Sequence, residues 1–383
     1  MRKTEKKVEF VKKKAIMLLL AAAVIGSLCA CGAGSETAPP AETAATVEPA
    51  TETTVEAAPD ETAETEPTVV EGDLFLKASS VTFSLVGEQE DIYLGVIPRE
   101  LVSWESDDPS VVSVENGVLT ATGVGTTTVR ASYADRSVSC TVGCLAETEE
   151  ALLQLDTDIL CAPKRLPPEV DLEEPCTYFD NSAIVGDSIT FIMFQWESKS
   201  NYLGDMLFLA RGGTSLNGIV RRFSNIYYKG TEANLEDAIQ QSGVERVYFL
   251  LGSNDIGDPN QRLLYFENWD IMLERIREKS PDVEIIMISN LPQYDDLDRP
   301  ERTQPRIRTY NELMVEYNAQ LRQYAEEHGC GYLDLSYYIQ DHFGRMAKIY
   351  HQDNYHLNEA GCLSWMKVLR YYAKYELEGG TLS

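Results

Sequence analysis

The second half of the chain alternates between short apolar runs and longer amphipathic segments, and this pattern restricts the folds open to it. Three segments, 261–279, 306–327 and 358–377, carry apolar residues at helical spacing. The runs with the length and composition of strands are Ser182–Val185, Met206–Ala210, Arg246–Leu251, Glu284–Ile288 and Gly331–Leu335. Alternation of strands and helices predicts a parallel sheet with helices on both faces.

Polar motifs follow the first three of these strands. They are Gly186-Asp187-Ser188-Ile189, Gly212-Gly213-Thr214-Ser215 and Gly252-Ser253-Asn254-Asp255. Open parallel sheets place their chemistry at the carboxyl ends of strands. A fourth motif, Asp353–Asn358, precedes the last helix on a loop that can return to the same edge. We therefore expect the four motifs to meet at one edge of the sheet.

The residue types in these motifs suit nucleophilic catalysis. Ser188 is a weak nucleophile that needs a base, and His356, beside a helix start, is the best candidate among four histidines. Asp353, three residues earlier, can orient that imidazole. The candidate oxyanion donors are the backbone N–H groups of Ser188 and Gly212 and the side-chain amide of Asn254.

The ordered set resembles the SGNH (GDSL-type) hydrolase family, over about residues 182–377. The residues that match its four blocks are Ser188, Gly212, Asn254 and His356. Asp353 matches the family's Asp-x-x-His, and Gly213, beside Gly212, is an alternative donor. The resemblance implies a flavodoxin-like three-layer α/β/α domain with a five-stranded parallel sheet. It also implies a serine ester hydrolase that needs no metal or organic cofactor.

Other polar and aromatic residues near these motifs have structural interpretations. Asp187 and Asp255 are expected to shape the loops, and His328 and His342 are expected at the surface. A metal site at His351, Asp353 and His356 is disfavoured because no further ligands accompany them. The helical spacing of three aromatic residues after the nucleophile favours the core over an acyl pocket; they are Phe191, Phe194 and Trp196.

The segment 73–145 has a different pattern, with about seven short alternating strands separated by turn signals. This pattern favours a small β-sandwich. Residues 104–114, followed by 117–121 and 123–127, resemble the bacterial Ig-like domain of group 2. The resemblance implies a spacer or adhesive module. A proline-containing connector is expected at 146–180, and the hydrolase domain at 181–383.

The first 30 residues combine a basic start, an apolar run and the sequence Leu28-Cys29-Ala30-Cys31. This resembles a bacterial lipoprotein signal, which implies cleavage before Cys31, lipidation of Cys31 and a membrane anchor facing the extracellular side. Plain secretion and an uncleaved anchor are the alternatives. Residues 31–72 are rich in Thr, Glu, Ala and Pro and are predicted to be a disordered linker.

Charge and cysteine content limit the partners. The formal net charge of −28 argues against nucleic acid, whose phosphates bind a surplus of Lys and Arg. Export would permit disulfides among the six later cysteines, although free thiols are also possible. Those cysteines are Cys140, Cys144, Cys161, Cys176, Cys330 and Cys362. Their spacing does not indicate a zinc site.

These observations favour a cell-surface serine esterase that removes short acyl groups, such as acetyl, from a carbohydrate. The alternatives among enzymes are a lysophospholipase or other lipid esterase, and an acyltransferase. A surface adhesion protein with an inactive hydrolase domain is the alternative from another class. Oligomeric state is left open by the sequence.

Overall fold

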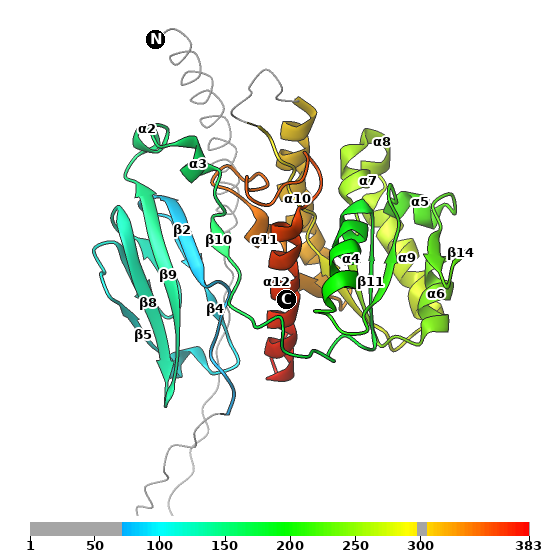
Figure 1. Ribbon diagram of the computed structural model, residues 1–383, viewed down its shortest axis with the longest axis horizontal. Coiled ribbons are helices and arrows are strands. Elements are labelled where there is room, and N and C mark those ends of the chain that lie inside the picture. Colours follow the sequence, from blue (N-terminus) through cyan, green and yellow to red (C-terminus); the bar gives the residue numbers. More distant parts are fainter. Residues whose placement is uncertain (1–70, 297–304, 383) are drawn as a thin grey trace, which may run out of the picture.

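The structure, a computed structural model, describes residues 71–296 and 305–382, and its sheets lie in two parts of the chain (Figure 1). The predicted signal segment, the predicted lipidation site at Cys31 and nearly all of the predicted linker lie outside the described residues. Within the described residues, no helix is both long enough and apolar enough to cross a membrane.

The second half of the chain forms a five-stranded parallel sheet, as predicted. Its strands are β11 (Ser182–Gly186), β12 (Leu207–Ala210), β15 (Arg246–Leu250), β16 (Glu284–Ile288) and β17 (Gly331–Leu333). Their order in the sheet is β12-β11-β15-β16-β17, and every neighbouring pair is parallel. This is the strand order of flavodoxin-like sheets, in which the chain reverses direction across the sheet beside its first strand.

Side chains on alternate residues of these strands enter two separate cores. Val247 and Phe249 of β15 pack on one face, whereas Tyr248 and Leu250 pack on the other. The first face is covered by α5 (Leu216–Val220), α6 (Leu235–Ser242), α9 (Tyr265–Lys279) and α10 (Pro305–Glu327). The second face is covered by α4 (Ser188–Ser200) and α12 (Glu359–Leu377). The domain therefore has the expected three layers.

Several short elements of this domain were not predicted. They are the hairpin β13 (Ile226–Tyr228) and β14 (Thr231–Ala233), the helices α5 and α6, and the single-turn helices α7 (Ser253–Gly257) and α11 (Ser336–Ile339). The predicted helix 261–279 is divided between α8 (Pro259–Arg262) and α9. Elements of three to five residues carry too few apolar positions to show a period, which is why the pattern missed most of them.

The first part of the described chain contains only strands and one 3-10 turn, η1 (Arg99–Leu101). Its strands are β1 (Phe75–Leu76), β2 (Ser80–Leu85), β3 (Gln89–Asp91), β4 (Tyr93–Leu94), β5 (Ser103–Ser106), β6 (Val112–Glu115), β7 (Val118–Ala121), β8 (Gly125–Tyr133) and β9 (Arg136–Ala146). We call residues 73–145 the β module. Its assignment to the bacterial Ig-like family stays a prediction.

The connector, residues 146–180, contains α2 (Glu149–Leu152), α3 (Thr157–Leu160) and β10 (Arg165–Leu166). Strand β10 pairs antiparallel with β2 and extends the largest sheet of the β module, whose order is β10-β2-β9-β8-β5. The two remaining sheets are β3-β7-β6 and β1-β4. The connector therefore has more regular structure than its prolines led us to expect.

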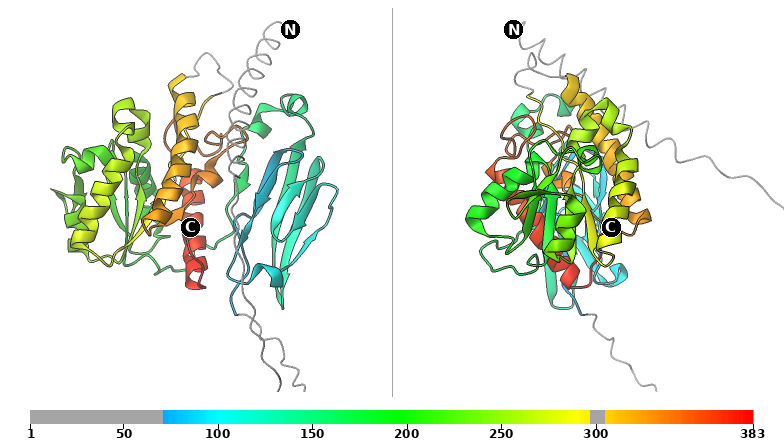
Figure 2. Two further views of the ribbon diagram at one scale, coloured as in Figure 1. Left: turned by 180° about the vertical axis from the view of Figure 1, so that it is seen from behind. Right: turned by 90° about the vertical axis from the view of Figure 1, so that its right-hand side faces the viewer.

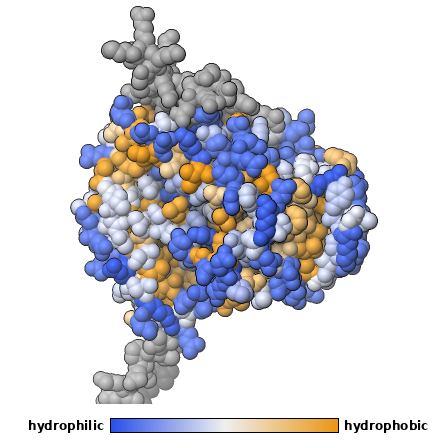
Figure 3. Space-filling model, in the orientation of Figure 1, coloured by the Kyte–Doolittle hydropathy of each residue, from blue (hydrophilic) through white to orange (hydrophobic). Residues whose placement is uncertain are grey.

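The β module lies beside the face of the parallel sheet that α12 covers, as views from the front and from behind both show (Figure 1 and Figure 2). Figure 3 shows hydrophilic residues over much of one face of the molecule, with hydrophobic patches between them. In the described chain the six cysteines from Cys140 to Cys362 are free thiols, and five of them are buried.

Candidate active site

The nucleophile candidate stands at the first position of a helix. Strand β11 ends at Gly186, and α4 begins at Ser188, with the side chain of Asp187 accepting a hydrogen bond from Ile189 N at 2.9 Å. A Cβ on residue 186 would lie 1.9 Å from Thr190 Oγ1, so this turn accepts only glycine. The first amide of a helix has no helical carbonyl to bond, which leaves the Ser188 N–H available beside its own hydroxyl.

His356 links the serine to an aspartate. Its Nε2 lies 2.9 Å from Ser188 Oγ, and its Nδ1 lies 2.8 Å from Asp353 Oδ2. A carboxylate oxygen can only accept, so Nδ1 carries the proton and Nε2 is the acceptor for the serine hydroxyl. The three residues predicted as a catalytic set are thus connected by hydrogen bonds over 168 positions of sequence.

The loop that carries this pair is held by its own hydrogen bonds. Asp353 Oδ1 accepts from the amides of Tyr355 and His356 at 2.7 and 2.9 Å. Partial burial acts to raise the pKa of Asp353, but the bonds from the His356 side chain and from these amides outweigh it and lower the pKa below its ordinary value. The side chain of Asn358 then caps α12 by accepting from Gly361 N. The catalytic loop, residues 351–358, is therefore ordered from both ends.

A second loop clamps the catalytic loop from the side. Tyr294 N donates to Asn354 O at 2.9 Å, and Asn354 Nδ2 donates to Tyr294 O at 3.0 Å. The Tyr294 ring is stacked on the imidazole of His351, with ring centroids 3.7 Å apart. The sequence contained no signal for Tyr294, because nothing local indicates which distant loop an aromatic ring will meet.

The three predicted oxyanion donors have different positions. Asn254 lies in α7, directly after β15, and its side-chain Nδ2 donates to Thr214 O at 2.7 Å and to Asp187 Oδ2 at 3.2 Å. Gly212 and Gly213 lie in the exposed turn after β12, the strand next to β11. The structure thus places all three strand-end motifs at one edge of the sheet.

Two buried carboxylates join these motifs. Asp187 accepts from the hydroxyl of Ser253, and Asp255 accepts from the amides of Leu216 and Asn217, both at 2.9 Å. Burial raises the pKa of Asp187, and it raises the pKa of Asp255 to about 6, against the opposing effect of these hydrogen bonds. Both side chains tie one strand-end loop to another, which agrees with the structural role that the sequence suggested.

A pocket of about 310 Å³ opens beside the serine. It is lined by Ser188, Ile189, Ser253, Asn254, Gly257, Leu291, Gln293, Tyr310, Tyr355 and His356. Three of the predicted site residues are in this set, whereas Gly212 is not among the described residues that line it. Gln293 and Tyr310 were missed, since their sequence neighbours carry no recognisable motif, and Tyr355 lies within the fourth motif but was not singled out as a site residue.

Gln293 is held in place by its backbone. Its N–H donates to Asn311 Oδ1 at 2.7 Å, and Asn311 Nδ2 donates to its carbonyl at 2.9 Å. Within the described residues, the side-chain amide of Gln293 makes no hydrogen bond, so its donor and acceptor remain available at the pocket wall.

Two expectations from the sequence are wrong. Phe191 and Phe194 are 41% and 40% exposed, packed against each other and Phe208 on the surface instead of in the core. The helical period of the aromatic residues continues onto the outer side of α4, beyond the face that meets the sheet. His342 is half-buried between the β module and the parallel-sheet domain, with Nδ1 2.9 Å from Ser84 Oγ, and is not a surface residue.

The described ranges contain no group of three or more His, Cys, Asp or Glu residues arranged to hold a metal ion. Ser188 and His356 supply a hydroxyl and an imidazole that accepts its proton, the pair that serine nucleophilic catalysis needs.

Comparison with known proteins agrees with this chemistry. Residues 184–362 match the GDSL-like Lipase/Acylhydrolase family. A search of curated proteins returned no match. Among solved structures, the chain is similar to a GDSL-like lipase from Bacteroides thetaiotaomicron, with 14% identity, a TM-score of 0.39, and coverage of 53% of this chain and 92% of the lipase.

Two further solved structures are similar at the same level. A carbohydrate esterase of family 3 from Talaromyces cellulolyticus has 15% identity and a TM-score of 0.34, over 52% of this chain and 98% of that chain. The catalytic domain of a peptidoglycan O-acetyltransferase from Streptococcus pneumoniae has 13% identity and a TM-score of 0.34, over 53% and 97%. On the family match, residues 184–362 are a GDSL-like lipase/acylhydrolase domain, and the protein is an enzyme that hydrolyses ester bonds.

Proposed function

We propose that the protein is a cell-surface serine esterase that removes short acyl groups, above all acetyl, from a carbohydrate. The observation that carries the chemistry is the pair of hydrogen bonds from Ser188 Oγ to His356 and from His356 to Asp353, 2.9 and 2.8 Å long. Such a relay makes a serine hydroxyl nucleophilic at neutral pH, because the imidazole accepts its proton as the new bond forms.

The reaction follows from this geometry. Ser188 Oγ attacks the ester carbonyl carbon while His356 Nε2 takes the hydroxyl proton, and Asp353 stabilises the resulting imidazolium. The tetrahedral intermediate collapses when His356 gives that proton to the leaving alcohol oxygen, which leaves an acyl-enzyme at Ser188. Water, deprotonated by His356, then attacks the acyl carbon, and the carboxylic acid leaves as Ser188 recovers its proton.

Negative charge on the carbonyl oxygen is stabilised by the predicted donors. Ser188 N–H lies at the first position of α4, and Gly212 N–H lies in the exposed turn after β12. Asn254 donates to two protein oxygens, and we propose that it releases the longer bond, 3.2 Å to Asp187, to donate to the oxyanion.

The size and polarity of the pocket support a short acyl group and a polar alcohol. Its volume of about 310 Å³ is at the lower end of the range for small-molecule sites. Asn254, Ser253, Gln293 and the exposed Tyr355 contribute polar groups to its wall. A long acyl chain would need a continuous apolar channel, and the exposed Phe191 and Phe194 are not part of the lining.

The proposed location rests on the sequence. A lipid on Cys31 would anchor the chain in the cell membrane, and the linker 31–72 would hold the rest away from it. We propose the order signal peptide 1–30, linker 31–72, bacterial Ig-like module 73–145, connector 146–180 and hydrolase domain 181–383. Acylated glycans of the cell envelope would then be within reach.

The enzymatic part of the proposal is tested with p-nitrophenyl acetate. Ser188→Ala should lower the rate by at least about 10³-fold, and Asp353→Asn by about 10²-fold or more, because the first removes the nucleophile and the second the group that orients His356. Ser198→Ala, on the exposed side of the same helix, is the control and should retain the wild-type rate. Wild-type turnover by Ser188→Ala would rule out this mechanism.

Substrate class is tested with matched esters. An acetylated oligosaccharide should be turned over with a kcat/KM well above that for a lysophospholipid of long acyl chain. The reverse order would replace the carbohydrate esterase by a lipid esterase.

A further inference from the structure

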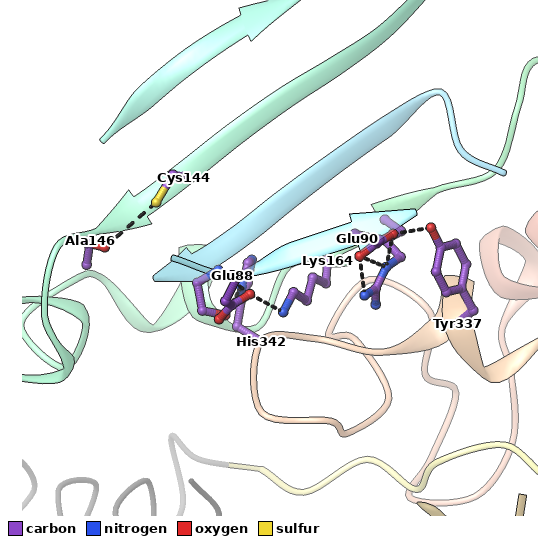
Figure 4. A network of polar contacts seen from close by, with 9 residues as sticks. Glu88, Glu90, Cys144, Ala146, Lys164, Tyr337 and His342 are labelled. Atoms are coloured by element: carbon purple, nitrogen blue, oxygen red, sulfur yellow. Dashed lines mark hydrogen bonds and ion pairs between the residues drawn. The ribbon is translucent and has the colours of Figure 1, made fainter. Parts of the chain in front are cut away.

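A mostly buried ion pair joins the connector to the β module, and a side chain of the parallel-sheet domain adds a third group to it. Arg165 Nε lies 2.9 Å from both carboxylate oxygens of Glu90, and the two side chains are 15% and 10% exposed. Tyr337 in α11 donates its hydroxyl to the same carboxylate (Figure 4). The Arg165 guanidinium lies 4.2 Å from the centre of the Tyr337 ring. We call Glu90, Arg165 and Tyr337 the junction.

Further contacts surround the junction. Figure 4 also shows His342, whose Nδ1 meets Ser84 Oγ, and the ion pair of Lys164 with Glu88 at 2.8 Å. Phe75 of the β module is 2% exposed because it is packed edge-on against the rings of Tyr371 and Tyr375 in α12.

Backbone groups also cross this interface. Tyr338 donates its hydroxyl to Lys77 O at 2.6 Å, and Leu76 N donates to Tyr371 OH at 2.9 Å. A module that moved freely as a spacer would break these two bonds and the bond from Tyr337 to Glu90, while Arg165 would stay with Glu90 through the pairing of β10 with β2. Polar groups that lose their partners in a mostly buried interface cost free energy.

The connector continues from the junction along the segment 340–348. Lys164 N donates to Gln340 O at 2.8 Å, and Lys348 N donates to Cys161 O at 2.9 Å. Pro163 forms an isolated bridge with Asp341 between these two bonds. The segment 340–348 ends three residues before the catalytic loop, so the connector fixes the chain that leads into His351–Asn358.

One buried cation joins this segment to the pocket wall. Arg345 donates to Asp341 Oδ2 at 2.6 Å, to Asp295 O at 3.0 Å and to Cys161 Sγ at 3.5 Å. Met346 N donates to Gln293 O at 3.3 Å, beside the Tyr294 clamp on the catalytic loop. The connector, the pocket wall and the segment that precedes the catalytic loop therefore share contacts.

From these contacts we infer that the β module and connector are a brace for the catalytic loop, and that Glu90, Arg165 and Tyr337 are positioning residues for His356. The inference rests on the proposed function, since it concerns how His356 is held against Ser188. The β module then forms one cooperative unit with the esterase domain and is not an independent spacer.

Calorimetry of the full chain tests the unit directly. The wild-type protein should unfold in one transition whose calorimetric and van't Hoff enthalpies agree. Two separable transitions, one for the β module and one for the parallel-sheet domain, would overturn the inference whether or not the enzyme turns over esters.

Kinetics of junction variants tests the positioning. The single variants Glu90→Gln and Arg165→Met should each lower kcat for p-nitrophenyl acetate by about 10-fold, with a smaller change in KM, because a misplacement of the base slows chemistry more than binding. Rates are expressed per active site, titrated with a serine-reactive fluorophosphonate, so that a variant that folds less completely does not appear to have a lower kcat. The double variant removes both charges and should recover most of the lost kcat.

Two controls keep the kinetics interpretable. Arg130→Met removes a cation that pairs with Glu105 and Asp107 within the β module, and Glu284→Gln removes the pair with Arg246 within the parallel sheet. Both should retain wild-type kcat. If the junction variants also retain the wild-type kcat per titrated site, the inference that the β module braces the catalytic loop is wrong. If instead Ser188→Ala keeps the wild-type rate, the esterase proposal fails. Calorimetry then still tests whether the β module and the parallel-sheet domain unfold as one unit.

Discussion

Among the described residues that line the pocket, Gln293 has a side-chain amide that makes no hydrogen bond to the protein. Its backbone is clamped by Asn311, and its side chain lies at the pocket that contains Ser188 and His356. A carbohydrate ester brings hydroxyl groups close to the reacting carbonyl, and an amide can both donate to them and accept from them. At the scale of the residue, the Gln293 side chain is therefore the best candidate for binding the hydroxyl groups of the alcohol part of the substrate.

We predict that Gln293→Leu raises KM for an acetylated sugar by about 3- to 10-fold, the range expected for the loss of one uncharged hydrogen bond. Hydrolysis of p-nitrophenyl acetate should change by less than about 2-fold, because its leaving group has no hydroxyl to bind. Gln320→Leu, on the exposed side of α10, is the matched control. An equal loss on both substrates would show that Gln293 acts on the fold of the pocket and not on the sugar.

At the scale of the element, the loops that follow the strands are built around backbone geometry that few residues tolerate. Gly252 starts α7 with φ at 139°, and a Cβ there would lie 2.5 Å from Asn290 Oδ1 and 2.6 Å from Tyr265 OH. This glycine lets β15 turn sharply into α7, which places Asn254 at the pocket and Asp255 under α5. The turn is thus a requirement of the site as well as of the fold.

Gly252→Ala should lower the free energy of unfolding by about 3 kcal/mol or more, since a strained backbone and a steric clash add together. Gly243→Ala is the control, because it also has a positive φ, 69°, but open space around the new Cβ. It should cost only about 1 kcal/mol. Urea unfolding of the two variants measures the difference, and equal costs would mean that the loop at Gly252 can move aside.

At the scale of the whole molecule, the two parts of the chain meet through groups that respond to pH. Burial lowers the pKa of His342 to about 4, with Lys164 and Arg165 acting in the same direction. Glu88, the partner of Lys164, is the nearby carboxylate of this network, and Ser84 bonds the neutral ring. The interface therefore holds His342 in its neutral form.

The sign of the pH effect follows from linkage. The unfolded chain takes up a proton at His342 below about pH 6.5, whereas the folded chain does so only near pH 4, so the protein loses stability as the pH falls through that window. We predict that His342→Gln, which cannot be protonated, reduces the fall in melting temperature between pH 7 and pH 4.5. Between pH 7 and pH 8.5 the variant and the wild type should change in parallel; an unchanged acid response would exclude His342 as its source.

Much of the parallel-sheet domain was predictable, because its strands, helices and turns are indicated by patterns among neighbouring residues. Strand and helix periods and turn residues are properties of neighbouring positions, so the parallel sheet and its three layers followed from alternation of apolar runs. The Ser188, Asn254 and His356 motifs each stand directly beside a strand end or a helix start, so the topology alone brings them to one edge. Short elements such as α5, α7 and the β13–β14 hairpin were not predicted, because three to five residues do not define a period.

What the sequence by itself determined, then, is the type of domain and the residues that we propose as nucleophile, base and its partner, because each of these roles requires a particular residue type in a particular local setting. Tertiary structure alone decided the surroundings of that chemistry. Gln293 at the pocket, Tyr294 against the catalytic loop and the junction of Glu90 with Tyr337, 247 positions apart, depend on which surfaces of distant segments pack together. Such contacts are set by shape and by the burial of apolar and charged groups in three dimensions, and no local pattern records them.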